Sequence, residues 1–149
     1  QKGLADMKQE IEPFLVKWGW KNSIDDFLEY WFQSDFVINK EGIETLRQLN
    51  SKGIGCYIAS NNEQHRAKYI EHKLKQADAP LSGYYFSADL KLRKENPDFF
   101  QIILNDLKIP SAEVFFIDDE QKNVDAAASV GIQASLYRKG ILNELLNKK

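Results

Sequence analysis

From residue 40 onward the chain alternates between short apolar segments and longer amphipathic ones, and this alternation limits the fold more than any other feature. The apolar segments predict strands at residues 54–60, 83–88, 113–118 and 133–137. The amphipathic segments predict helices at residues 40–53, 61–77, 96–108 and 120–131, with a last helix from residue 140. Alternation of this kind indicates βαβ units and a parallel sheet covered on both faces. We therefore predict a three-layer, Rossmann-like α/β fold with right-handed connections.

The first part of the chain has a different pattern. Apolar residues recur at three- and four-residue steps over residues 4–18, which predicts an amphipathic helix that ends at Gly19. A second helix is predicted from Ser23, its N-cap, with Asp25 and Asp26 in the first turn. These two helices precede the alternating region and form a separate segment, residues 1–38, ahead of residues 39–149.

Composition excludes several classes of function. The 149 residues include 20 basic and 22 acidic side chains, a net charge of −2, so no bulk field attracts nucleic acid or an anionic membrane. No apolar run approaches the roughly 20 residues of a membrane span. The single cysteine, Cys56, excludes an internal disulfide and fits a reducing compartment, so we expect a cytoplasmic protein.

Two adjacent aspartates, Asp118 and Asp119, follow the apolar residues "VFFI" directly. Carboxylates placed side by side at the end of a buried strand repel each other unless a cation lies between them. Mg²⁺ suits such a pair, because it prefers oxygen ligands and uses one or two carboxylates with water and phosphate. The alternative is that these aspartates only cap the next helix. The same tripeptide at Ile24–Asp26 is better explained by the electrostatics of a helix start.

Two further features lie near predicted strand ends. In "ASNN", Ser60 ends a strand, and Asn61 and Asn62 are expected to open a helix, which is a ready anion site or a simple N-cap. Lys94, in "LKLRKENPDFF", precedes a helix and can place a charge on phosphate, although Lys91 and Arg93 are close rivals. Because strand ends of a parallel sheet share one edge, Ser60, residues 87–89 and Asp118–Asp119 should converge there.

A hydroxyl, a lysine and paired aspartates in this order resemble the haloacid dehalogenase (HAD) superfamily. "YIASNN" is similar to its second motif, Lys94 with "ENPDFF" to its third, and "VFFIDDEQKNVDAAASVGI" to its fourth. The likeness covers residue 40 to the end, so residues 39–149 would form a HAD-like core. Residues 1–38 resemble the end of the helical cap of subfamily I phosphatases, with sugar-phosphate phosphatase-like and epoxide-hydrolase N-domain-like members closest.

The resemblance implies a role for each matched residue. Ser60 and Asn61 would hold the phosphoryl group, and Lys94 would neutralise it. Asp119 would bind Mg²⁺, Asp118 would bind it directly or through water, and Asn123 would orient that loop. The implied activity is Mg²⁺-dependent hydrolysis of a small phosphorylated metabolite through an aspartyl-phosphate.

One departure from the family pattern is large, because the sequence contains no Asp-x-Asp motif, the source of the family's nucleophile. We expect that the chain lacks an N-terminal segment with the central strand of the sheet. The fragment would then be inactive, and its exposed sheet edges could support oligomerisation. The alternative is a non-catalytic HAD-like binding or regulatory protein. A response-regulator receiver is disfavoured, because its acidic pair comes first in sequence.

Overall fold

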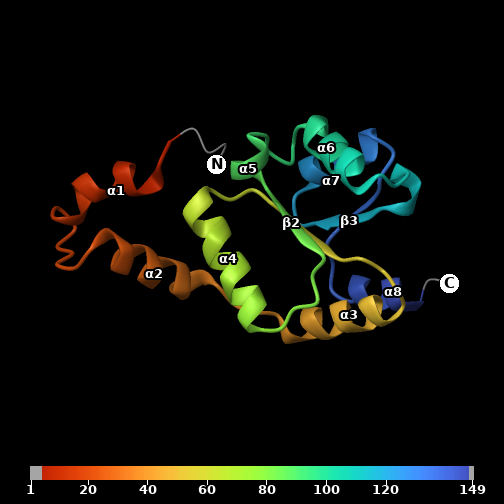
Figure 1. Ribbon diagram of the computed structural model, residues 1–149, viewed down its shortest axis with the longest axis horizontal. Coiled ribbons are helices and arrows are strands. Elements are labelled where there is room, and N and C mark those ends of the chain that lie inside the picture. Colours follow the sequence, from red (N-terminus) through yellow and green to blue (C-terminus); the bar gives the residue numbers. More distant parts are fainter. Residues whose placement is uncertain (1–4, 148–149) are drawn as a thin grey trace.

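The computed structural model describes residues 5–147 and contains the predicted alternation of strands and helices (Figure 1). The elements in chain order are α1 (Met7–Leu15), α2 (Ile24–Asp35), α3 (Lys40–Ser51), β1 (Tyr57–Ser60), α4 (Gln64–Gln76), β2 (Gly83–Phe86), α5 (Ser87–Leu90), α6 (Pro97–Leu107), the 3-10 turn η1 (Ser111–Glu113), β3 (Phe115–Asp118), α7 (Gln121–Ser129), β4 (Gln133–Leu136) and α8 (Ile141–Asn147). The predicted α/β fold with parallel strands is confirmed.

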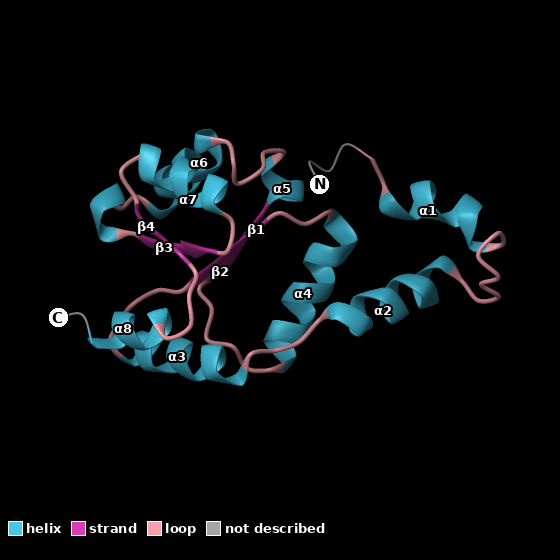
Figure 2. Cartoon of the chain, turned by 180° about the vertical axis from the view of Figure 1, so that it is seen from behind, coloured by secondary structure: helices cyan, strands magenta, loops and turns pink. Residues whose placement is uncertain are grey.

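The strands form two parallel pairs. β1 pairs with β2, with Ser60 opposite Phe86, and β3 pairs with β4, with Asp118 opposite Leu136. Among the described residues no ladder joins β1 to β3. The two pairs nevertheless lie in one layer between helices (Figure 2).

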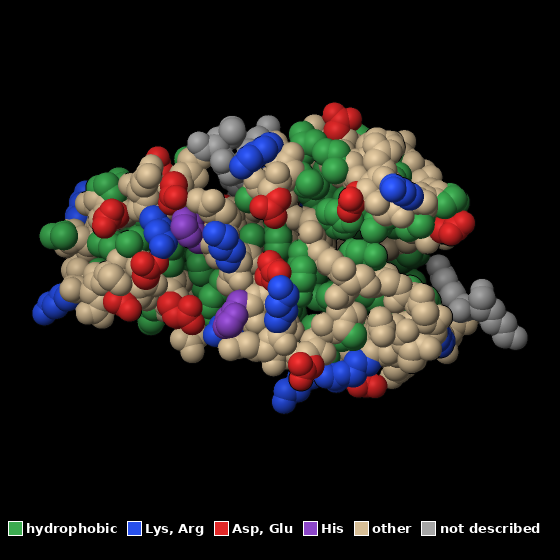
Figure 3. All heavy atoms as spheres, viewed as in Figure 1, with side chains coloured by type: hydrophobic (Ala, Val, Ile, Leu, Met, Phe, Trp, Pro, Cys, Tyr) green, Lys and Arg blue, Asp and Glu red, His purple; other side chains and the backbone are tan. Residues whose placement is uncertain are grey.

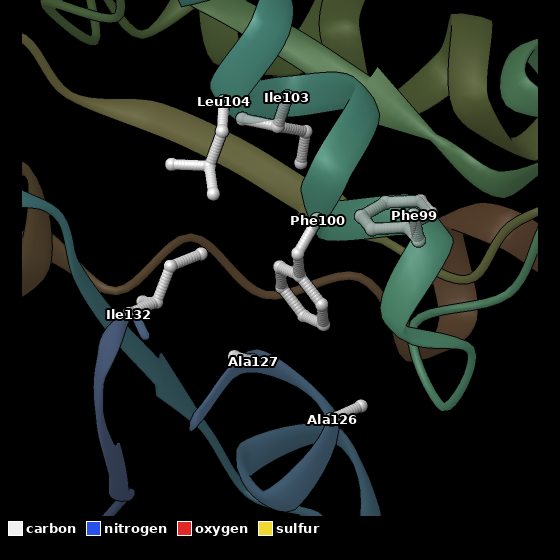
Figure 4. Close-up of a cluster of buried hydrophobic side chains, with 7 residues drawn as sticks. All are labelled: Phe99, Phe100, Ile103, Leu104, Ala126, Ala127 and Ile132. Carbon is white, nitrogen blue, oxygen red and sulfur yellow. The ribbon is translucent and has the colours of Figure 1, made fainter. Parts of the chain in front are cut away.

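One helical layer packs on both strand pairs. Its core cluster comes from α6, α7 and the residue before β4, and consists of Phe99, Phe100, Ile103, Leu104, Ala126, Ala127 and Ile132. Figure 4 shows the Phe100 ring pointing toward the alanines of α7. Every strand adds a partly buried residue to this cluster, and these are Ala59, Tyr85, Phe116 and Ala134. The two pairs are therefore halves of one layer, joined by a shared core rather than by backbone hydrogen bonds.

The opposite side of the strands is covered by α3 and α8, which lie side by side (Figures 1 and 2). The Lys52 ammonium, next to the end of α3, donates to the Leu146 carbonyl of α8 at 2.5 Å. A cavity of about 370 Å³ lies against β3, β4 and α8, but none of the predicted site residues lines it. The arrangement is the predicted three-layer sandwich.

The two leading helices form a hairpin that extends away from the strands and packs on α4 (Figure 1). Leu28, Phe32 and Tyr69 are the buried centre of this contact. Arg66 of α4 pairs with Asp35 at 2.6 Å, and its guanidinium lies 4.9 Å from the centre of the Phe32 ring. Apolar burial and a cation–π contact therefore both hold the hairpin on α4.

The hairpin also differs from the sequence prediction. The helix predicted over residues 4–18 is shorter, because Asp6 is the N-cap of α1 and accepts a hydrogen bond from the Lys8 N–H. The predicted stop at Gly19 is present, with a φ of +74°. Phe14 and Trp18, two of the apolar residues in this periodic pattern, are nevertheless 47% and 56% exposed. They are exposed because α1 has neighbours on one side only.

Two turns were predicted with different success. The strand predicted over residues 83–88 ends at Phe86, and Ser87 starts the short helix α5. The helix end at Gly131 is as predicted, since this residue has a φ of +87°. A Cβ there would lie 2.6 Å from the Ser111 hydroxyl oxygen, so the turn requires glycine on two grounds.

Charge is distributed evenly over the face seen in Figure 3, where acidic and basic side chains alternate over the hairpin and α4. No patch of a single sign forms there, in agreement with the net charge of −2. Within residues 5–147, no helix has both the length and the apolar character that a membrane span requires.

Candidate active site at the carboxyl edge of the strands

The candidate site lies where β1 and β3 end. Ser60 is the last residue of β1 and Asp118 the last of β3. Both strands end at the same edge of the layer, as expected for parallel strands. The loop between α5 and α6 carries Lys94 to this edge, where its ammonium reaches the Asp118 carboxylate.

Lys94 connects the two sides of the edge. Its backbone N–H donates to the Asn61 side-chain oxygen at 2.9 Å, which ties its loop to the end of β1. Its ammonium donates to Asp118 Oδ2 at 2.5 Å. Both charged side chains are nearly inaccessible, at 11% and 3% exposed. The three motifs predicted from sequence therefore form one continuous chain of contacts.

The other oxygen of Asp118 is also fully engaged. Asp118 Oδ1 accepts hydrogen bonds from the Glu120 N–H at 3.0 Å and from the Asn123 amide at 2.8 Å. Burial alone would raise the pKa of Asp118, but the hydrogen bonds from Lys94, Asn123 and the Glu120 N–H outweigh it and hold this pKa below its usual value. The carboxylate is therefore kept ionised inside the protein.

Helix capping does not explain the aspartate pair. The N-cap residue of α7 is Glu120, and its side chain makes no capping hydrogen bond. Asn123 is fully buried in α7 and also donates to Glu120 at 3.0 Å. The amide of Asn123 thus contacts the Asp118 carboxylate at the end of β3, and its positioning role in a reaction stays a prediction.

The residues at this edge fit a hard divalent cation. Asp118 is buried and ionised, and the adjacent Asp119 is exposed to solvent. The Asn123 side-chain oxygen is buried without a hydrogen-bond partner among the described residues. No cluster of three or more acidic, histidine or cysteine side chains occurs in the described chain. Such a cluster is not required, because Mg²⁺ needs only one or two carboxylates with water. In this structure the Lys94 ammonium is the cation in contact with Asp118.

The residues after β1 form a loop, so the prediction that Asn61 and Asn62 open a helix is wrong. The helix α4 begins at Gln64, and its N-cap is Glu63. The Glu63 carboxylate accepts the backbone N–H of His65 at 2.9 Å and that of Arg66 at 2.5 Å. Since Glu63 caps the helix, the side chains of the loop are left for other contacts.

Those contacts shape the loop itself. The Asn62 amide donates to the Ser60 hydroxyl oxygen at 2.6 Å, and the Ser87 hydroxyl donates to the Asn62 carbonyl at 3.1 Å. Ser60, Ser87 and Asp118 thus gather at one edge, as predicted, while Asp119 points to solvent. The loop presents a serine hydroxyl and the Asn61 side chain next to the Lys94 backbone.

Glu95 is a site residue that the motif pattern did not single out. Its carboxylate accepts the Asn61 amide at 3.2 Å and pairs with Arg93 at 2.9 Å. Burial would raise the pKa of Glu95, but its own backbone N–H, Arg93 and Asn61 lower it overall. Arg93 is thereby engaged by a different acid, and Lys94 alone of the three basic candidates is placed on Asp118. The only sequence signal for Glu95 is its position after Lys94.

The model of the haloacid dehalogenase-like hydrolase family matches residues 8–131. The chain belongs to the haloacid dehalogenase-like hydrolases. The match includes Ser60, Asn61, Lys94, Asp118, Asp119 and Asn123, so every candidate site residue lies within the family region of this HAD chain.

Several curated relatives of this HAD chain are phosphatases by name. A sesquiterpene phosphatase of Aspergillus oryzae is 29% identical over 90 residues, which are 58% of this chain and 44% of the relative. An enolase-phosphatase of Methylococcus capsulatus is 26% identical over 102 residues, or 67% of this chain and 44% of the relative. The chain thus spans less than half the length of these relatives.

Solved HAD structures share the fold. A HAD family enzyme of Bacteroides thetaiotaomicron, solved as a magnesium complex, superimposes with a TM-score of 0.79 at 23% identity. The similarity covers 99% of this chain and 77% of that one. The same enzyme solved with magnesium and inorganic phosphate gives a TM-score of 0.76 over 93% of this chain and 72% of that one. At 23% identity this similarity shows a shared fold and nothing further about the HAD chain.

Proposed function

We propose that the protein containing this chain is a Mg²⁺-dependent phosphomonoester hydrolase acting through an aspartyl-phosphate on a small phosphorylated metabolite. The observation that carries the proposal is the contact chain Asn61–Lys94–Asp118, which joins the loop after β1, our proposed phosphate-binding loop, to a buried carboxylate. Family membership and the phosphatase relatives support the same chemistry. Phosphoryl transfer depends mainly on positioning and charge stabilisation, which these residues are suited to provide.

On the metal side, Asp118 and Asp119 would hold Mg²⁺. Bound there, the ion would neutralise negative charge on the transferring phosphoryl group. Asn123 keeps the Asp118 carboxylate in position through its hydrogen bond of 2.8 Å. The 3% exposure of the Asp118 side chain excludes water from that carboxylate and strengthens its interaction with a cation.

On the anion side, Ser60, Asn61 and Lys94 would bind the phosphoryl oxygens. A hydroxyl, an amide and an ammonium provide neutral and charged donors at one end of the strands. Asn61 accepts the Lys94 N–H and donates to Glu95, so its orientation is fixed from both sides. Donors held in place in this way stabilise developing charge without reorganising.

The nucleophile requires a further element, since the sequence contains no Asp-x-Asp motif. We place it on a parallel strand between β1 and β3, the two strands that share a layer but no ladder. Such a strand would end between Ser60 and Asp118. Residues 1–38 are proposed to be part of a helical cap beside that site, and residues 39–149 to be the core.

Hydrolysis of p-nitrophenyl phosphate with Mg²⁺ tests the proposal. The 149-residue chain should show no turnover, while a longer protein that adds a strand ending in Asp-x-Asp should be active. In that active protein, Lys94→Met and Asp118→Asn should each lower kcat by about 10²-fold or more. Lys91→Met, a neighbouring lysine exposed to solvent, is the matched control and should keep activity within about threefold.

Two results would contradict the proposal. The first is robust turnover by the 149-residue chain, since its own residues would then supply the nucleophile. The second is a longer protein with such a strand that remains inactive, which would favour a non-catalytic binding protein.

A further inference from the structure

The backbone of Lys94 lies on the anion side of the proposed site, and its ammonium lies on the metal side. Its backbone is anchored to Asn61, on the proposed anion side, by the hydrogen bond of 2.9 Å. Its ammonium lies 2.5 Å from Asp118 Oδ2, on the proposed metal side. Rotation of this one flexible side chain could therefore move a positive charge between the two sides while the loop stays fixed.

The ammonium and a metal ion compete for the same carboxylate. Asp118 Oδ1 is already held by Asn123 and the Glu120 N–H, so Oδ2 is the oxygen through which Asp118 meets an outside cation. Lys94 occupies that oxygen. Two cations at hydrogen-bonding distance from one oxygen repel each other, so we expect Lys94 to withdraw when a metal ion binds there.

Withdrawal without a replacement is costly for both groups. The Lys94 and Asp118 side chains are 11% and 3% exposed, and a buried charge that loses its partner is strongly destabilising. Asp118 can lose the ammonium readily only if another cation arrives. Lys94 can leave only if another negative group receives it, and a phosphate bound by Ser60 and Asn61 would lie on its own side of the site.

We propose that Lys94 acts as an internal counter-ion of Asp118 that is released by an anion, so that a divalent cation and phosphate bind this chain cooperatively. The inference rests on the proposed function for the location of the two binding sides. It adds that the Lys94–Asp118 ion pair weakens the binding of either ligand alone. Binding of one ligand breaks the pair and so strengthens the binding of the other. Coupling between two ligands is reciprocal, so the same factor must appear in both affinities.

Calorimetric titrations of the 149-residue chain measure this coupling directly. Mg²⁺ is titrated with and without saturating inorganic phosphate, and phosphate with and without saturating Mg²⁺. Each ligand should lower the Kd of the other by about fivefold or more, within the usual range of coupled sites. Neither measurement depends on catalytic activity.

A lysine variant separates the role of Lys94 from direct attraction between Mg²⁺ and phosphate. In Lys94→Met, Mg²⁺ alone should bind more tightly than to the wild type, by about fivefold, because its competitor is gone. The effect of phosphate on Mg²⁺ should shrink to the part that direct attraction supplies. Lys91→Met, which removes a nearby exposed charge, should change the Mg²⁺ affinity by less than twofold.

A second variant approaches the pair from the other partner and keeps the test decisive if Lys94→Met folds poorly. Asp118→Asn frees Lys94 and should strengthen metal-free phosphate binding by about fivefold. Asp119→Asn removes an equal charge from the adjacent residue, which Lys94 does not contact, and should change phosphate affinity by less than twofold.

The outcomes distinguish this inference from the proposed function. Independent binding of Mg²⁺ and phosphate, or equal effects of Asp118→Asn and Asp119→Asn, overturns the inference and leaves the proposed function standing. Binding of neither ligand by the 149-residue chain under any condition overturns the inference, whereas the proposed function is decided by turnover of the longer protein. Coupling that shrinks in Lys94→Met but not in Lys91→Met supports both.

Discussion

The tripeptide Ile-Asp-Asp occurs twice in this chain, at the start of α2 and at the end of β3, and the two copies have little in common. In the first copy the Asp25 side chain is 72% exposed and pairs with Lys8. Asp26 completes a capping box with Ser23, whose hydroxyl donates to it at 2.6 Å. These acids serve the helix that contains them.

In the second copy, Asp118 serves a site built from distant segments. Its partners are Lys94, which is 24 residues earlier, and Asn123 on the following helix. The adjacent Asp119 stays in solvent. The difference shows that the surroundings of a short motif decide its role, because the end of β3 buries Asp118 and the start of α2 exposes Asp25.

The largest expected effect is the difference in stability lost when Asp118 and Asp25 are each replaced by alanine. Asp118→Ala leaves the buried Lys94 ammonium without its partner and should lower the free energy of unfolding by about 3–5 kcal/mol. Asp25→Ala removes a surface ion pair and should cost less than about 1 kcal/mol. Urea unfolding followed by tryptophan fluorescence measures both. Equal losses of unfolding free energy in the two variants would show that Asp118 contributes no more to stability than the exposed Asp25.

Replacing the buried pair as a unit sharpens this result. The double variant Lys94→Met/Asp118→Leu exchanges two buried charges for apolar side chains and should recover most of the stability lost in Asp118→Ala. The same unfolding measurement applies. A double variant as unstable as the single one would mean that Asp118 acts mainly through Asn123 and Glu120.

The first copy should depend on its capping box. Ser23→Ala removes the oxygen that accepts the Asp26 N–H at 3.1 Å and should cost about 1 kcal/mol. Thermal unfolding by circular dichroism measures the loss. Ser34→Ala, at an exposed serine near the other end of α2, is the control. A loss no greater than that of the control would show that Ser23 does not stabilise the helix start.

Replacing Asp119 should weaken Mg²⁺ binding without lowering the stability of the fold. Asp119→Ala alters an exposed side chain and should change the free energy of unfolding by less than about 0.5 kcal/mol. The same variant should weaken Mg²⁺ binding in the presence of phosphate by about tenfold, since it removes one proposed ligand. Mg²⁺ affinity equal to that of the wild type would exclude Asp119 as a ligand.

A smaller, pH-dependent effect is expected at Asp6, an aspartate of the leading hairpin. The hydrogen bond from His65, 3.0 Å from Asp6, lowers the pKa of Asp6 below its ordinary value of 3.8. Its contribution to stability is therefore present above pH 3.8 and lost as the pH falls through the lowered pKa. Acid titration by tryptophan fluorescence should show a flatter response below that pH in Asp6→Asn. Superimposable curves would exclude a role for the pair.

Local signals explain which parts of the fold could be predicted. The start of α2 follows from Ser23 and Asp26, and the start of α6 from Asn96 and Pro97, because caps act over three or four residues. The Asn61–Asn62 segment was mistaken for a helix start, since asparagine is also a common cap. The actual cap, Glu63, is a residue type less often used there.

The candidate site could be predicted as a set of residues but not as a set of contacts. Lys91, Arg93 and Lys94 carry the same charge. Apart from the motif likeness that favoured Lys94, the sequence does not say which one faces Asp118. In the structure Lys94 reaches Asp118, while Arg93 is engaged by Glu95. The pairing of His65 with Asp6 joins residues 59 apart, and no local pattern predicts a contact at that separation.

The shared core beneath β1–β2 and β3–β4 has a practical consequence. Phe99, Phe100 and the alanines of α7 pack on both strand pairs from one face, so the layer has a common core without a ladder between β1 and β3 among the described residues. If a separate peptide supplied the strand proposed between β1 and β3, this chain would act as the larger partner of a split protein. A synthetic peptide of strand length could then be tested for restoring function in trans, and its side chains varied without cloning a new protein.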